Sequence, residues 1–257
     1  MLLQILWIIS TVLILLIAIT PTTNANSLVE QQFTFQKTSS FIDETKIMHV
    51  YGEVKNISNK AMRNVVVKAS FYDAYGKMIN EFKRSSELRT INPGEISPFE
   101  ILYIDTKSVD TVKNYTISAI GQETERKVRA LRIASNNSRL DLMGVYYIIG
   151  RVINEGSQDA TNCMIIATLY DKDGRVITIG RAQTEPVNMS SYSESAFDLP
   201  VTEKLQTYKV KSYSLIADSD QYVTIPEFSQ LETVSLLLFL LFAVETAITK
   251  LKPLNKC

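Results

Sequence analysis

Hydrophobic and polar residues alternate with a period of two in two separate parts of the chain. One run spans residues 65–72 and places Val65, Val67, Ala69 and Phe71 on one face. The other spans residues 163–170 and places Cys163, Ile165, Ala167 and Leu169 on one face. Such alternation, rich in β-branched and aromatic residues, predicts a strand with one buried face. A turn sequence (73–76 or 171–174) and a return strand follow each run, so each part centres on a β-hairpin.

The two parts are copies of one pattern at a constant offset of 98 positions (150 − 52). The matched pairs include Gly52/Gly150, Val54/Val152, Asn56/Asn154, Asn64/Asn162, Ala69/Ala167, Tyr72/Tyr170, Asp73/Asp171, Gly76/Gly174, Ile79/Ile177 and Ala119/Ala217. Because no insertion interrupts the match, we interpret it as a duplicated domain. Residue i should therefore share its environment with residue i + 98. We also expect Tyr72 and Tyr170 each to pack within its own domain.

Short strand patterns flank both hairpins, and no long amphipathic helix lies between them. This combination predicts an all-β fold of two tandem antiparallel β-sandwiches. Polar residues 122–143 are expected to join the copies, either as a linker or as a last strand plus linker. The expected organisation is a signal peptide or signal anchor (1–25), an N-terminal segment (26–45), a first sandwich (46–121), a linker (122–143), a second sandwich (144–219), a stalk (220–230), a transmembrane helix (231–250) and a cytoplasmic tail (251–257).

Each copy contains Gly-x-Val-x-Asn and then a strand that ends in a hydrophobic residue, Tyr and Asp. These motifs are Gly52–Asn56, Ala69–Asp73 and Pro93-Gly94-Glu95 before Phe99 in the first copy, and Gly150–Asn154 and Ala167–Asp171 in the second. The pattern resembles the FxLYD-type domain of bacterial and archaeal surface proteins. This resemblance implies an immunoglobulin-like fold and a surface role, but no activity. The family's leading Phe is replaced by Ala in both copies, which implies different core packing.

Both ends of the chain are apolar. Residues 2–19 are almost wholly apolar and a polar breaker follows, which predicts a signal peptide cleaved after Ala25. An uncleaved signal anchor is the alternative, because no Lys or Arg precedes the run. Residues 231–250 are long enough to cross a bilayer, and the lysines from Lys250 onward predict a cytoplasmic tail. The body between the ends should then lie outside a cell membrane that the chain crosses once. Glu245 should pair near the interface with Lys250.

The stalk contains the tripeptide Pro226-Glu227-Phe228. A Pro-Glu-Phe sequence before an apolar span and a few basic residues resembles the C-terminal anchoring segment of archaeal surface proteins, especially those of ammonia-oxidising archaea. The resemblance implies that these three residues form an anchor-processing motif.

Composition gives little support for chemistry. Acidic and basic residues are equal in number, 27 of each, so no basic surface for nucleic acid is expected. One histidine, His49, and two distant cysteines cannot form a usual zinc or copper site or a nucleophile–base pair. We expect His49 to be a structural or exposed strand residue and Cys163 a buried small hydrophobe. Residues 171–174 are interpreted as a hairpin turn and not a calcium loop. We therefore expect no catalytic, cofactor-binding or metal-binding residues and no cofactor.

Four Asn-x-Ser/Thr sequences are candidate N-glycosylation sites if the body is exported. Their acceptors are Asn56, Asn114, Asn136 and Asn188. The sequence as a whole predicts a non-enzymatic, membrane-anchored cell-surface glycoprotein with a binding, adhesion or scaffolding role. Its expected partners are the membrane and either envelope or surface-layer proteins. The alternative is an exported accessory subunit of a membrane protein complex.

Overall fold

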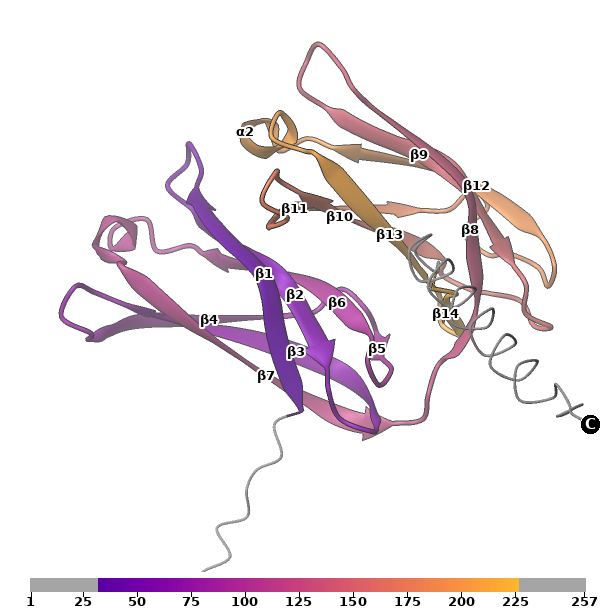
Figure 1. Ribbon diagram of the computed structural model, residues 1–257, viewed down its shortest axis with the longest axis horizontal. Helices are drawn as coiled ribbons and strands as arrows, with labels where there is room; N and C mark the ends of the chain where they lie inside the picture. Colours follow the sequence, from indigo (N-terminus) through magenta and orange to yellow (C-terminus); the bar gives the residue numbers. More distant parts are fainter. Residues whose placement is uncertain (1–31, 227–257) are drawn as a thin grey trace, which may run out of the picture. The chain divides into compact units, whose positions relative to one another are not determined.

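A computed structural model describes residues 32–226, and most of this range is β-strand (Figure 1). This confirms the predicted all-β class. The elements are β1 (Phe33–Ile42), β2 (Met48–Asn56), β3 (Ala61–Tyr72), β4 (Met78–Ser85), β5 (Thr90–Ile91), β6 (Ile96–Tyr103), η1 (Val109–Thr111), β7 (Asn114–Thr124), β8 (Val128–Leu140), β9 (Tyr146–Asn154), β10 (Met164–Tyr170), β11 (Val176–Gln183), β12 (Glu194–Val201), α2 (Lys204–Thr207), β13 (Ser212–Asp218) and β14 (Tyr222–Thr224).

Strands β1 to β7 form the first repeat, in which two sheets enclose one core. One sheet has the order β1-β2-β6, and the other is built on β3, which pairs with β4, β5 and β7. All of these pairs are antiparallel. The buried residues between the sheets include Val50, Val67, Phe71, Phe99 and Tyr103. The alternation of residues 65–72 thus buries the face that the sequence predicts.

Strands β8 to β14 form the second repeat. Their order is β11-β10-β13-β14-β8-β9-β12, so β14 joins the two layers into one continuous sheet. The β14–β8 pair is parallel, whereas the other pairs are antiparallel. A second core contains Ile148, Ile165, Leu169, Phe197 and Leu199.

The strands of the two repeats keep the offset of 98 positions. Strand β2 corresponds to β9, β4 to β11 and β6 to β12 at every residue. Gly52 pairs with Phe99 and Gly150 pairs with Phe197, and a Cβ at either glycine would come within 2.7 Å of that Phe ring. The ring occupies the space that a side chain would need, which explains why both copies have glycine. The predicted equivalence of residues i and i + 98 is confirmed here.

Asn56 and Asn154 hold the same loop in both repeats. The Asn56 Nδ2 atom donates hydrogen bonds to the backbone oxygens of Lys60 and Ile91, at 2.7 and 2.9 Å. The Asn154 Nδ2 atom donates to Gln158 and Met189 at 2.9 and 3.4 Å, again 98 positions later. Both side chains are fully buried. Since a buried amide needs such partners, these asparagines are structural.

The expected domain boundaries need three corrections. Residues 122–143 are mainly strand, because β8 begins at Val128 and only residues 125–127 connect the repeats. The expected N-terminal segment contains β1, and the expected stalk contains β14. In β8 most side chains are exposed, and β14 has only three residues, so neither strand gives a clear alternation. Each repeat is therefore larger than its sequence pattern indicates.

Several predicted segments lie outside the described residues. These are the signal peptide or signal anchor, the transmembrane helix, the cytoplasmic tail, and Glu227 and Phe228 of the tripeptide. Within residues 32–226, no helix is long and apolar enough to cross a membrane.

Candidate functional site

The two repeats share a buried interface. Strand β11 of the second repeat packs against β1, β2 and β6 of the first. Ile166, Tyr170, Val176 and Ile179 of the second repeat are buried against the core of the first. On β10, residues Ile165 and Leu169 face the second core, so Ile166 and Tyr170 lie on its outward face. Both faces of this strand are therefore covered.

A buried tyrosine and a buried carboxylate join the repeats. The Tyr170 hydroxyl donates to Glu53 Oε1 at 2.6 Å and lies 2.9 Å from Ser214 Oγ. Glu53 Oε2 accepts a hydrogen bond from Gln36 at 2.8 Å and lies 3.4 Å from the Lys37 ammonium. Burial raises the pKa of Tyr170, and its hydrogen bond to Glu53 adds to the rise. The carboxylate is thus paired on both oxygens.

This contact corrects the expectation that Tyr170 packs only within its own domain. Its counterpart Tyr72 is partly exposed, and its hydroxyl lies 3.5 Å from Thr116 in the same repeat. The difference arises because the outward face of β10 is covered by the first repeat, whereas the outward face of the matched strand β3 is not covered by the second.

A second polar cluster centres on Glu100 of β6. Its Oε1 atom accepts from the Tyr51 hydroxyl at 2.8 Å and lies 3.1 Å from His49 Nδ1. Its Oε2 atom lies 2.8 Å from Arg84 and 3.8 Å from Arg181 of the second repeat. Burial opposes ionisation, but the hydrogen bonds from His49 and Tyr51 and the two arginines lower the pKa of Glu100 to about 2. Glu100 is therefore ionised at neutral pH.

His49 lies between two carboxylates and two rings. Its Nδ1 atom faces Glu100, and its Nε2 atom is 3.4 Å from Asp43 Oδ2. The rings of Phe41 and Tyr51 stack on it at centroid distances of 4.7 and 5.8 Å. Burial lowers the pKa of His49, but hydrogen bonds to Glu100 and Asp43 outweigh burial and raise it. Of the two expectations, a structural residue or an exposed strand residue, these contacts fit the structural one.

Further charged contacts hold the interface. The Arg181 guanidinium donates to both carboxylate oxygens of Glu87. The Lys127 ammonium lies 2.6 Å from Asp218 Oδ1, and Arg89 lies 3.3 Å from its Oδ2 atom. Burial raises the pKa of Asp218, although Lys127 and Arg89 act in the opposite direction. Removing one partner of such a buried pair leaves a charge without compensation. These contacts therefore favour one fixed arrangement of the two repeats.

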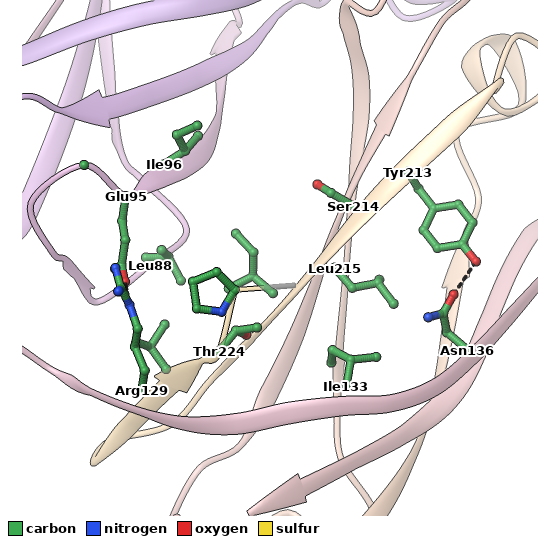
Figure 2. A pocket seen from close by; sticks show the side chains of 14 residues that line it. Leu88, Glu95, Ile96, Arg129, Ile133, Asn136, Tyr213, Ser214, Leu215 and Thr224 are labelled. Carbon is green, nitrogen blue, oxygen red and sulfur yellow. Dashed lines mark hydrogen bonds and ion pairs between the residues drawn. The ribbon is translucent and has the colours of Figure 1, made fainter. Parts of the chain in front are cut away.

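Beside this interface lies a groove of about 690 Å³ (Figure 2). Leu88 and Ile96 of the first repeat and Ile133, Leu215 and Val223 of the second form its apolar surface. Two polar pairs flank this surface (Figure 2). Arg129 Nε donates to Glu95 Oε1 at 2.7 Å, and the Tyr213 hydroxyl donates to Asn136 Oδ1 at 2.7 Å. Pro226, the last described residue, also lines the groove. An apolar surface with a few fixed polar groups suits binding of an extended, mainly apolar ligand.

The described residues offer few reactive groups. Residues 32–226 hold no group of three His, Cys, Asp or Glu side chains that could bind a metal ion. Burial raises the pKa of the Cys163 thiol to about 11, so it is a protonated, buried side chain as expected. Both ring nitrogens of His49 already face carboxylates.

The four glycosylation candidates differ in their surroundings. Asn56 is fully buried, and its Nδ2 atom, to which a glycan would be attached, donates two backbone hydrogen bonds. A glycan on Asn56 would therefore require its loop to open, so Asn56 is the least accessible of the four candidates. Asn114, Asn136 and Asn188 are exposed. Asn136 lies in β8 and not in a linker, and its Oδ1 atom accepts from Tyr213.

Sequence reasoning missed the interface and the groove. The outward positions of β10 carry Met164, Ile166, Thr168 and Tyr170, whereas the matched positions of β3 carry Val66, Lys68, Ser70 and Tyr72. A strand that is apolar on both faces is typically buried on both. The presence of Ile166 where the first repeat has Lys68 therefore indicated that the outward face of β10 is buried. The charge pairs gave none, because their partners are far apart in the sequence.

No family model and no characterised protein matches this chain. Among solved structures, the exo-chitosanase CsxA of Amycolatopsis orientalis aligns with 74% of this chain and 26% of its own, at 8% identity and a TM-score of 0.28. Red sea bream transglutaminase aligns with 76% of this chain and 32% of its own, at 7% identity and a TM-score of 0.23. The chain thus spans between a quarter and a third of these proteins. TM-scores this low identify neither a fold family nor an activity.

Proposed function

We propose that this chain is a membrane-anchored cell-surface protein whose two repeats form a rigid, non-enzymatic binding or scaffolding body. The observation that carries the proposal is that the described chain begins and ends at the same end of its sheets. Phe33 pairs with Asn56, and Thr124 pairs with Ala61, so β1 starts where β7 ends. Tyr222 of β14 pairs with Val128, which follows β7 after the three-residue connection 125–127. The apolar C-terminal segment, and the N-terminal one in the signal-anchor alternative, would thus leave the body at the same end.

The two sandwiches are proposed to be immunoglobulin-like. In each repeat three strands (β1-β2-β6 or β8-β9-β12) face three others (β4-β3-β7 or β11-β10-β13). This arrangement supports the resemblance that the Gly-x-Val-x-Asn and Tyr-Asp motifs indicate. Such sandwiches host many functions, so the fold by itself supports no particular ligand.

The accessory-subunit alternative gains support from the groove. A cavity of about 690 Å³ with a mainly apolar surface is large enough for an extended segment of another subunit. In that case the rigid body would position the groove above the membrane. Both versions require an exported body and an anchor.

Topology is the claim to test first. Protease added to intact cells that express the full chain should digest the body and leave a short C-terminal fragment. Alkaline carbonate should fail to extract the undigested chain, because a spanning helix satisfies its own backbone in lipid. Protection of the body until the membrane is broken would overturn the surface assignment, and release by carbonate would overturn the anchor.

A further inference from the structure

One end of the second repeat exposes a cluster of large apolar side chains. Leu142 and Met143 form the tip of the β8–β9 turn and are 102% and 67% exposed. Leu205 and Tyr208, in and just after α2, are 41% and 62% exposed. We call these four residues the apolar tip. Large apolar residues are commonly exposed one at a time, but a cluster points to an interaction.

Tyr208 lies beside the turn that carries Leu142 and Met143, and Leu205 precedes Tyr208 by three residues. A Cβ at Gly144 would come within 2.9 Å of the Tyr208 hydroxyl, so the Tyr208 side chain lies over the turn. The Thr207 hydroxyl donates to the Gly144 carbonyl at 2.7 Å and holds α2 against the same turn. Figure 1 shows α2 and this turn at one end of the second repeat.

The first repeat provides an internal control for this surface. The same turn exists there: Asp43 Oδ1 accepts from the backbone nitrogens of Thr45 and Ile47, as Asp141 Oδ1 accepts from Met143 and Val145. The matched positions of the apolar tip are nevertheless polar. They are Glu44 for Leu142, Thr45 for Met143, Lys107 for Leu205 and Asp110 for Tyr208.

Because the turn is kept while four exposed positions all become apolar, folding of the turn does not explain the change. Leu142 and Met143, which are 102% and 67% exposed, add little to the core of the second repeat. The change is therefore more simply explained by a contact that only the second repeat makes.

Basic residues surround the apolar tip. Arg139, Lys204 and Lys209 are exposed, and none of them forms a salt bridge within residues 32–226. Their matched positions in the first repeat are Phe41, Thr106 and Thr111, which are uncharged. Lys46 and Lys107 of the first repeat are replaced by Gly144 and Leu205, but Glu44 and Asp110 are lost as well, so the second repeat is both more positive and more apolar here. A complementary surface would offer an apolar pocket with carboxylates at its edge.

The tip lies far from where the chain leaves the sheet. Strand β8 runs from Val128, beside Tyr222, to Leu140, next to the tip. Thirteen residues of strand span roughly 40 Å. If the C-terminal segment is the anchor, as proposed above, the tip points away from that membrane. A lipid surface on the anchor side is then out of reach.

We propose that the apolar tip is the docking site for a partner protein that presents an apolar pocket edged by carboxylates. Leu142, Met143 and Tyr208 would enter the pocket, and Arg139, Lys204 and Lys209 would face its acidic edge. A few apolar anchors inside a charged ring are typical of the energetic centre of an interface.

The chain contains both a probe and a control for this contact. Met143 lies in the tip, whereas Met78, 54% exposed, lies on β4 of the first repeat. Mild peroxide treatment converts exposed methionine to its sulfoxide, which mass spectrometry measures at each residue. The full chain would be compared in native membranes and after purification in detergent.

We expect the two methionines to be oxidised at similar rates in the purified chain. In native membranes Met143 should be oxidised about tenfold more slowly, as ~90% occupancy would give, and Met78 should be unchanged. About 1 M salt should weaken the protection without abolishing it, because it screens the contacts between exposed charges but not the apolar contact. Leu205→Lys, which installs the residue type of the first repeat, should remove the protection. Ile104→Lys, at an exposed position of the first repeat, should leave it intact.

The other outcomes overturn the proposal. Equal rates before and after purification would mean that nothing covers the tip, and protection of both methionines would mean general shielding. Protection that rises with the concentration of the purified chain would identify a second copy as the occupant. Protection by protein-free vesicles that contain anionic lipid would identify a bilayer. This test is independent of the anchor proposed above. If the chain had no anchor, carbonate would release it from membranes, but the ratio of the Met143 and Met78 oxidation rates would be unchanged.

Discussion

The hydroxyl of Tyr170 should make a measurable contribution to stability. Tyr170→Phe keeps the ring but removes the 2.6 Å hydrogen bond to Glu53 and the 2.9 Å contact with Ser214. A hydrogen bond to a charged group contributes about 1.5–3 kcal/mol. Glu53 keeps its bond from Gln36, so it is not left unpaired. We therefore expect a loss at the lower end of this range, about 1.5–2 kcal/mol.

The first repeat contains the matched control. Tyr72→Phe removes only a 3.5 Å contact with Thr116 at a partly exposed site. Its cost should stay within about 0.5 kcal/mol, the usual range for surface substitutions. The two variants delete the same atom from equivalent strands, so their difference isolates the contact between the repeats.

Urea unfolding of the full chain in detergent, followed by circular dichroism, measures both free energies. A double-mutant cycle with Glu53→Met then measures the coupling, which should be about 1–2 kcal/mol for a direct contact. Equal losses for Tyr170→Phe and Tyr72→Phe, or a coupling near zero, would refute the reasoning. The interface would then not form in solution as described.

Three further predictions test other parts of the molecule. Since the pKa of His49 is raised, its contribution to stability is complete below the unfolded-state pKa of about 6.5 and disappears as the pH rises through the folded-state pKa. His49→Gln should therefore lower the melting temperature at about pH 5.5 more than at about pH 9, and equal losses would contradict this. Lys127→Met should cost about 3 kcal/mol in urea unfolding, because it leaves buried Asp218 with one cation fewer; a loss below about 1 kcal/mol would contradict the pairing. Glycopeptide mass spectrometry of the exported chain should find Asn56 unmodified even where Asn136 carries a glycan, and a glycan on Asn56 would mean that its loop opens.

The hairpins and the repeat could be predicted because they depend on local signals. Alternation over residues 65–72 and 163–170 predicts β3 and β10, and the glycines at the turns, Gly76 and Gly174, have positive φ angles of 76° and 74°. A single sequence shows such features directly, since period and turn chemistry need no knowledge of distant residues.

The outer strands could not be predicted in the same way. In β8 only Ala130, Leu131 and Ile133 are buried, and β14 is a three-residue strand that closes the sheet by pairing with β8 and β13. Such strands owe their existence to neighbours that are distant in the sequence. The charge pairs are further examples, because Glu53 and Tyr170 are 117 positions apart. Nothing local marks them as partners.

Each repeat has one outward face that the other repeat does not cover. In repeat proteins, terminal units need a polar outer face, because no neighbour covers it. Lys68 and Tyr72 lie on the free face of the first repeat, where the second repeat has the buried residues Ile166 and Tyr170. On the other free face, Arg151 is exposed and pairs with Glu194, where the first repeat has the buried Glu53.

Each copy therefore carries a charged residue, Lys68 or Arg151, on the face that the other copy does not cover. A third unit stacked on either side would have to cover Lys68 or Arg151, which pair with Glu81 and Glu194 at the surface. Taking such pairs out of water carries a desolvation cost that can exceed their mutual attraction. The same comparison of matched positions separates structural from interacting residues elsewhere in the chain. Where both copies agree, as at Asn56 and Asn154, the residue maintains the fold, and where an exposed position becomes apolar in one copy, a contact beyond the fold is the simplest cause.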